Sequence, residues 1–199
     1  MLQTIAAFDF DGTLTNKDTL LAFIKHTHKP VSRILRLLFV SPFLLLYKAG
    51  LMDNGKTKQK FFSAYYKNWT IEKFDNYCNS FLPIIDSCIR ADVYQKMRNH
   101  LIEDHKVLIV SASIENWIIP WAKQERISEV IATQIEISPK GYLTGRFLTK
   151  NCYGKEKERR ILQLFPERNH YFLIAFGDTK CDREMLAMAD EKHYVNYCK

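Results

Sequence analysis

Short apolar runs alternate with segments of helical periodicity over most of the chain. Residues 3–10, 106–113 and 170–178 are apolar runs without a breaker, and each predicts a buried strand. Two alternating segments around residues 139–141 predict a hairpin, and residues 155–164 predict a helix. Residues 193–197 predict a final short strand. Apolar strands separated by helices favour an α/β fold, with a Rossmann-like parallel sheet covered by helices on both faces.

The stretch from Asp18 to about Arg98 differs, because it is helical in period and lacks a convincing strand. Pro30, Pro42 and Pro83 punctuate it, so we expect four or five helices. We therefore predict a core domain of residues 1–16 and 92–199 and an all-helical cap domain of residues 17–91. Such an insertion after the first strand would lie over the ligand-binding edge of the sheet as a lid.

Residues 34–47 are apolar apart from Arg36, Ser41 and Pro42. The run is shorter than the ~20 residues needed to cross a bilayer, and Pro42 is expected to break it in two. We expect it to pack in the core of the helical lid. The alternative is an interfacial hairpin on a membrane surface, since Arg33, Arg36 and Lys48 flank the run.

Composition and charge narrow the function only slightly. The chain has 199 residues, 47% of them hydrophobic, and a formal charge of +7. These values suit one folded, single-core protein that meets phosphorylated substrates, anionic lipid or nucleic acid. Five dispersed cysteines without a CxxC pair, and an N-terminus without a signal-peptide pattern, predict a cytoplasmic protein. The six histidines show no metal-ligand spacing in the sequence.

A basic nucleic-acid-binding module is the non-enzymatic alternative. Its best candidate is the basic run 56–60, which precedes several aromatic residues. That segment has the pattern of a helix with one packed face, so we expect no nucleic-acid partner.

Polar residues follow three of the predicted strands where each strand ends. Asp9 and Asp11 follow the first, Ser111 lies in the second, and Asp178 ends the third. Ligands bind at the carboxyl ends of parallel strands, so these residues are expected to converge. An aspartate is a recognised covalent nucleophile, and Asp9 with Asp178 would offer Mg²⁺ the carboxylates it prefers. If a phosphoryl group is transferred to Asp9, then Asp11, two residues later, would protonate the alkoxide that leaves phosphorus. It would later deprotonate the water that attacks the aspartyl phosphate.

Four motifs in order resemble those of the haloacid dehalogenase superfamily. They are FDFDGTL, VLIVSAS, the lysine in CYGKEKERRIL, and FGDTKCDREML, and the closing VNY resembles the phosphoserine-phosphatase-like branch. The resemblance implies a magnesium-dependent phosphomonoester hydrolase that acts through an aspartyl-phosphate intermediate on a small phosphorylated metabolite. It also implies that the backbone carbonyl of Asp11 joins Asp9 and Asp178 as a metal ligand.

The remaining motif residues have roles that the resemblance implies. Ser111 would donate its hydroxyl to a phosphoryl oxygen, and Lys157 would place an ammonium beside the same oxygens. Asp182 would hold that lysine or a metal-bound water. Lys155 also fits a glycine-to-lysine pattern, but the spacing from Cys152 favours Lys157.

The substrate is less constrained. Asp18, Gly12 and Ala112 are candidate substrate contacts, although Asp18 could equally cap the helix that follows it. Phosphoserine phosphatases carry a glutamate where this chain has Asp18, and usually Ser-Gly-Gly where it has Ser-Ala-Ser, so phosphoserine is disfavoured. The apolar run 34–47 is similar to one in bacterial phosphatidylglycerophosphate phosphatases. A lipid phosphatase at the membrane surface is therefore the alternative, and the oligomeric state stays open.

Overall fold

The computed structural model describes residues 2–127 and 129–195, and its centre is a five-stranded parallel sheet. The strand order is β3-β2-β1-β6-β7. The bounds are β1 Gln3–Phe8, β2 Lys106–Ile114, β3 Glu129–Thr133, β6 Tyr171–Gly177 and β7 Glu191–Tyr194. Phe8, the last residue of β1, pairs with Ile109 of β2 and Phe176 of β6. Asp9 therefore leaves the sheet between its two neighbouring strands.

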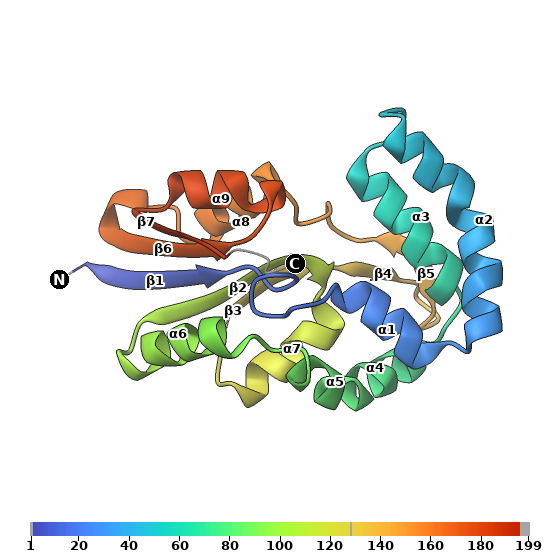
Figure 1. Ribbon diagram of the computed structural model, residues 1–199, viewed down its shortest axis with the longest axis horizontal. Helices are drawn as coiled ribbons and strands as arrows, with labels where there is room; N and C mark the ends of the chain where they lie inside the picture. Colours follow the sequence, from blue (N-terminus) through green and yellow to red (C-terminus); the bar gives the residue numbers. More distant parts are fainter. Residues whose placement is uncertain (1, 128, 196–199) are drawn as a thin grey trace.

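Helices cover both faces of this sheet because side chains alternate along each strand. Ile5 and Ala7 of β1 face one cluster, and Ala6 and Phe8 face the other. In Figure 1, α8 and α9 lie on one side of the sheet and α6 and α7 on the other. Their bounds are α6 Ala91–Ile102, α7 Glu115–Gln124, α8 Lys155–Leu164 and α9 Arg183–Met188, with 3₁₀ turns at η1 Arg168–His170 and η2 Lys180–Asp182. The predicted α/β fold is confirmed.

The inserted segment is helical, as expected. Its helices are α1 Thr19–Thr27, α2 Pro30–Lys48, α3 Asn54–Tyr66, α4 Ile71–Ser80 and α5 Leu82–Asp86. They share aromatic packing with the core, where Phe23 of α1 stacks on Trp117 of α7 at 4.8 Å between ring centroids. The buried cluster thus continues from the cap into the core, and the boundary at residues 16–17 and 91–92 stays a prediction.

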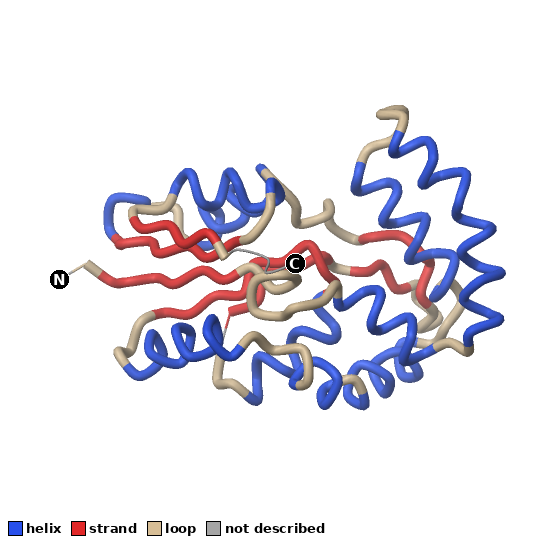
Figure 2. The backbone as a smooth tube through the Cα atoms, in the orientation of Figure 1, coloured by secondary structure: helices blue, strands red, loops and turns tan. Residues whose placement is uncertain are grey.

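The predicted hairpin, β4 Ile135–Ile137 and β5 Leu143–Phe147, belongs to neither layer of the core. Figure 2 shows its two strands beside the cap helices rather than in the central sheet. The Leu143 and Trp69 backbones bond at 2.8 Å, and the Phe147 amide donates to Gln59 of α3 at 2.9 Å. The inserted segment is therefore helical, and two strands from a later part of the chain pack against it.

The expectation that Pro42 splits the apolar run is wrong, because α2 is one helix of 19 residues with Pro42 inside it. A proline within a helix cannot bond the carbonyl four residues earlier, here that of Leu38. The Ser41 hydroxyl donates to that carbonyl at 2.8 Å instead. The neighbouring serine therefore satisfies the carbonyl that Pro42 leaves free.

The expectation that this run packs in the lid core is also wrong. Among the residues of α2, all of which the structure describes, only Val40 is buried. Large apolar side chains of the helix are exposed instead: Val31, Ile34, Leu35, Leu37, Leu38, Phe39, Leu45, Leu46 and Tyr47. By length and composition α2 is also apolar enough to cross a membrane. The periodicity of this run correctly predicts a helix. It does not predict that the apolar face of that helix is exposed.

Candidate active site

Asp9, Lys157 and Asp182 form a buried cluster at the carboxyl edge of the sheet. The Lys157 ammonium lies 2.5 Å from Asp9 Oδ1 and 2.5 Å from Asp182 Oδ1, and all three side chains are almost completely buried. Lys157 reaches them from the first turn of α8, which begins after Gly154. Lys155 is exposed on the other side of that turn. Of the two lysines that fitted the pattern, Lys157 is thus the one that contacts Asp9.

Asp178 lies beside this cluster, directly after β6. Carboxylate oxygens of Asp9, Asp178 and Asp182 lie within 4.8 Å of one another. Asp182 is already engaged, because its second oxygen accepts the Asp178 and Thr179 amides at 3.2 Å each. Asp178 is held more lightly, by the Thr13 hydroxyl at 3.4 Å. Asp9 and Asp178 are therefore a fitting all-oxygen pair for a hard divalent cation, with Asp182 holding Lys157.

Asp11 is tied to the start of the cap. Its Oδ1 accepts the Thr19 amide at 3.0 Å, and its Oδ2 accepts the Ser113 hydroxyl. Ser113 and Thr19 bond each other at 3.2 Å, and the Trp117 indole donates to Thr19 at 3.1 Å. Because an indole N–H can only donate, the hydrogen bonds run from Trp117 through the Thr19 and Ser113 hydroxyls to Asp11. This series of bonds orients the Asp11 carboxyl group. The sequence signal for it was only the serine two residues after Ser111.

The other predicted contacts divide into two groups. Ser111 is buried within β2 and lines the same cavity as Asp9. Ala112 and Asp18 also line this cavity. Asp18 also caps α1 by accepting the Leu21 amide at 2.9 Å, as the alternative reading anticipated. Gly12 is not among the lining residues; its positive φ of 91° turns the chain after Asp11.

Lys58 is a candidate site residue that sequence reasoning missed. It lies on α3, and its ammonium donates to the Ala112 carbonyl at 2.9 Å, so the cap reaches the carboxyl end of β2. It also lines the cavity that holds Asp9 and Asp11. A lysine in a basic helical run gives no sequence signal of this contact.

The active-site cavity has a volume of about 530 Å³ and two chemically different parts. Its floor carries Asp9, Asp11, Ser111 and Lys157. Its cap side is mostly apolar, with Asp18, Asn54, Thr57 and Lys58 as polar residues among Leu20, Leu21, Leu37, Leu44, Tyr47 and Phe61. The cavity therefore suits a molecule with an anionic group at one end and an apolar body at the other.

Burial and mutual attraction set the protonation of the site. Burial raises the pKa of Asp9 to about 7 against the opposing effect of Lys157. Burial also raises the pKa of Asp178 to about 6, helped by the charge of Asp182, and raises the pKa of Asp11. Burial alone would lower the pKa of Lys157, but Asp9 and Asp182 outweigh it and raise that pKa. The carboxyl groups of Asp9, Asp178 and Asp182 are crowded together beside the single ammonium of Lys157. Such an excess of negative charge strongly stabilises a bound cation.

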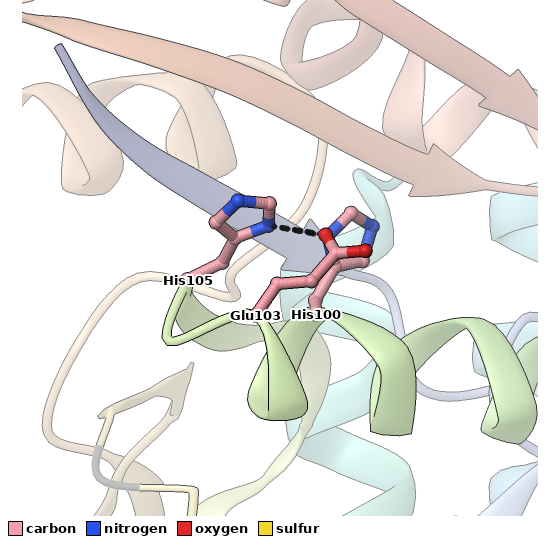
Figure 3. A group of neighbouring side chains, drawn as sticks. All are labelled: His100, Glu103 and His105. Carbon is pink, nitrogen blue, oxygen red and sulfur yellow. Dashed lines mark hydrogen bonds and ion pairs between the residues drawn. The ribbon is translucent and has the colours of Figure 1, made fainter. Parts of the chain in front are cut away.

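A second group of potential ligands, His100, Glu103 and His105, lies where the chain passes from α6 into β2. His100 and His105 approach to 2.9 Å between their Nδ1 atoms, with Glu103 3.4 Å from His105 (Figure 3). The chain reverses at Asp104, whose φ is 57°, and this brings His105 back toward α6. The expectation that no histidines have metal-ligand spacing did not allow for this turn. None of these three residues lines the active-site cavity.

Comparisons with known proteins agree with this geometry. The family model described as haloacid dehalogenase-like hydrolase matches residues 6–187. The chain belongs to this family. Protein CicA of Caulobacter vibrioides is 34% identical over 194 residues, which cover 96% of this chain and 85% of that protein. The family resemblance that the four motifs predicted is confirmed, and the chain is a hydrolase.

Solved structures share the fold. A protein of unknown function from Bordetella pertussis Tohama I has a TM-score of 0.79 and 17% identity, over 96% of this chain and 89% of that one. A phospho-aspartyl intermediate analogue of phosphoserine phosphatase has a TM-score of 0.67 and 17% identity, over 96% and 86%. The predicted phosphoserine-phosphatase-like branch is confirmed at the level of the fold.

Proposed function

We propose that this protein is a magnesium-dependent phosphomonoester hydrolase that transfers the phosphoryl group to Asp9 and then to water. The observation that carries the proposal is the contact of Lys157 with both Asp9 and Asp182. It fixes the Asp9 carboxylate at the cavity floor and places a positive charge where an anionic phosphoryl group would arrive. An ordinary buried ion pair would not open onto a cavity that Ser111 also lines.

Asp11 supplies the proton transfers in this scheme. In the first step Asp9 forms a bond to phosphorus, the ester oxygen leaves, and Asp11 gives that oxygen its proton. In the second step Asp11 takes a proton from water, whose oxygen bonds to phosphorus and releases Asp9. Its raised pKa, caused mainly by burial, favours the protonated form that the first step needs. Ser113 and the Thr19 amide keep the carboxyl group in place.

Asp9, Asp178 and the Asp11 backbone carbonyl are the proposed ligands of Mg²⁺. When bound, the ion would neutralise charge on the transferred phosphoryl oxygens. Oxygen-only donors favour Mg²⁺ over softer transition metals, which select nitrogen and sulfur ligands.

The apolar side of the cavity bears on the substrate. The leaving group of a small polar phosphate such as phosphoserine would face mainly leucine and aromatic side chains, with few polar partners among them. We therefore favour an ester with an apolar leaving group over the small phosphorylated metabolite that the motifs first suggested. Nucleic acid fits less well, because Phe62, Tyr65 and Tyr66 beside the basic run are buried and unavailable for stacking on bases.

Hydrolysis of p-nitrophenyl phosphate by the purified chain tests the proposal. We expect turnover with Mg²⁺, none in excess EDTA, and recovery when Mg²⁺ is restored. The Asp9→Asn variant should lose turnover, by roughly 10⁴-fold or more as nucleophile variants do, while keeping the circular dichroism spectrum of the wild type. Full activity in EDTA, or retained hydrolysis by a folded Asp9→Asn variant, would refute the mechanism.

A further inference from the structure

Helix α2 is built with its polarity reversed relative to a helix that covers a soluble core. Arg36 in the middle of the helix turns toward the protein, where its guanidinium bonds the Ala64 carbonyl of α3. The backbone of the same helix is tied to α3 as well, because the Arg33 carbonyl accepts the Tyr65 hydroxyl at 3.0 Å. Its leucines turn away from the protein, with Leu38 63% exposed and Leu45 66% exposed. A soluble lid would bury the leucines and expose the arginines. The outward apolar face therefore needs an apolar partner.

The charge around α2 indicates what that partner is. Between Asp18 and Asp53 the sequence has no aspartate or glutamate, but it has five basic residues: Lys25, Lys29, Arg33, Arg36 and Lys48. Lys25, Lys29 and Lys48 are exposed. A second copy of the chain would bring like charges together across a two-fold axis. An apolar surface with anionic groups around it, which is the interface of an anionic bilayer, is complementary to both features.

The helix packs side by side with α3 at the outer side of the cap (Figure 1), and Val40 is the buried residue of α2. Crossing a bilayer would require α2 to leave α3 and give up these contacts, together with the Arg36 bond. We therefore place α2 in the plane of the interface, with its leucines in the acyl region.

The exposed face is continuous with the active-site cavity. Leu37 and Leu44 line the cavity that holds Asp9, and Leu38 and Leu45 are the next residues along the helix, on the adjoining outer face. An apolar chain leaving the bilayer beside α2 would thus meet apolar side chains all the way to the catalytic floor.

We propose that α2 docks the enzyme on an anionic lipid bilayer and that its substrate is a lipid phosphomonoester drawn from that bilayer. Docking stands on the surface of α2 alone, whereas the substrate class rests on the proposed phosphatase activity. The phosphate group would enter the cavity floor while the acyl chains stay against Leu37, Leu44 and the outer face of α2.

Flotation with liposomes tests the docking. We expect the full chain to float with vesicles containing phosphatidylglycerol, less with pure phosphatidylcholine, and less as salt is raised. The double variant Leu38→Glu/Leu45→Glu should lose about tenfold or more in vesicle affinity, since each leucine loses its place in the acyl region. The matched control Ile102→Glu, 75% exposed at the end of α6, should float like the wild type.

Two further measurements keep the docking test decisive. Thermal melts should show that the leucine double variant stays folded, because both leucines are exposed. If that variant unfolds, the double variant Lys29→Glu/Lys48→Glu replaces it. The lysine variant should also weaken flotation. Light scattering reports the alternative of a second copy. A wild type that fails to float, variants that float as well as the wild type, or a dimer that the leucine variant dissociates without any vesicle binding would overturn the proposal.

The substrate class is tested by matched esters. Phosphatidic acid in vesicles and glycerol 3-phosphate share a headgroup and differ in the acyl chains. We expect the lipid to be hydrolysed faster, and the leucine double variant to lose that reaction while keeping hydrolysis of p-nitrophenyl phosphate, whose cavity neither residue lines. Equal rates on both esters would refute the lipid substrate. If the wild type does not hydrolyse p-nitrophenyl phosphate, the proposed phosphatase activity is refuted, whatever the flotation result.

Discussion

Lys58 connects the cap to the catalytic edge through a single side chain. Its ammonium bonds the carbonyl of Ala112 and lines the cavity beside Asp11, whose charged form it favours. A cation at this position would also attract the phosphoryl group or an anionic headgroup as it enters. Lys58 therefore brings a positive charge from the cap to the site.

The Lys58→Ala variant should raise the KM for p-nitrophenyl phosphate about tenfold, which is the loss of one charge-assisted hydrogen bond. Its kcat should change less, because Asp9 and Asp11 are untouched. Lys60→Ala is the matched control, since Lys60 is exposed on the same helix and does not line the cavity. Steady-state kinetics of the two variants checks this prediction. Equal KM values for both variants would show that Lys58 does not contribute to substrate binding.

The sequence could place some of these residues and not others. Asp9 and Asp178 follow neighbouring parallel strands, so the sheet itself brings them together, and the helix start after Gly154 brings Lys157 beneath them. Lys58 and Ser113 act through contacts that depend on how the cap docks. Nothing local in a charged run or a Ser-Ala-Ser segment indicates such a contact.

At the scale of elements, α2 carries an internal proline at a modest cost. A proline inside a helix costs roughly 3 kcal/mol relative to alanine. The Ser41 hydroxyl offsets part of this by bonding the Leu38 carbonyl, a contribution of about 1 kcal/mol. Because Pro42 is exposed, removing its ring opens no cavity in the core.

Replacing Pro42 with alanine should therefore stabilise the protein by about 1–2 kcal/mol and raise Tm by a few degrees. Pro30→Ala is the control, because proline at the first position of a helix has no bond to lose. Thermal melts followed by circular dichroism measure both variants. A lower Tm for Pro42→Ala would show that the proline is needed for the shape of α2.

Element type was easier to predict than element surroundings. Periodicity identified the helices, but an apolar period does not reveal whether the apolar face meets protein or lipid, and this caused the error over α2. The short strand β3 was not predicted, since it is only five residues long and begins with a charged one. Its place at the sheet edge comes from pairing with β2, which is tertiary information.

At the scale of the whole molecule, the cap and the core both hold Asp11, the proposed acid–base residue. Asp11 belongs to the first core motif, yet its carboxyl oxygens are held by Thr19 at the start of the cap and by Ser113 near the end of β2. The order of the motifs predicted the core fold and the family. The hairpin β4–β5 was predicted, but its packing against the cap was not, because its partners there lie far away in the sequence.

The most direct test of the account is where the phosphoryl group resides during turnover. Enzyme quenched in acid while hydrolysing p-nitrophenyl phosphate with Mg²⁺ is digested, and its peptides are examined by mass spectrometry. We predict one added phosphoryl group on Asp9, removed by hydroxylamine as an acyl phosphate should be, and absent from the Asp9→Asn variant. A phosphoryl group on Ser111, or none on any residue of an enzyme that is turning over under conditions where acyl phosphates survive, would contradict the account.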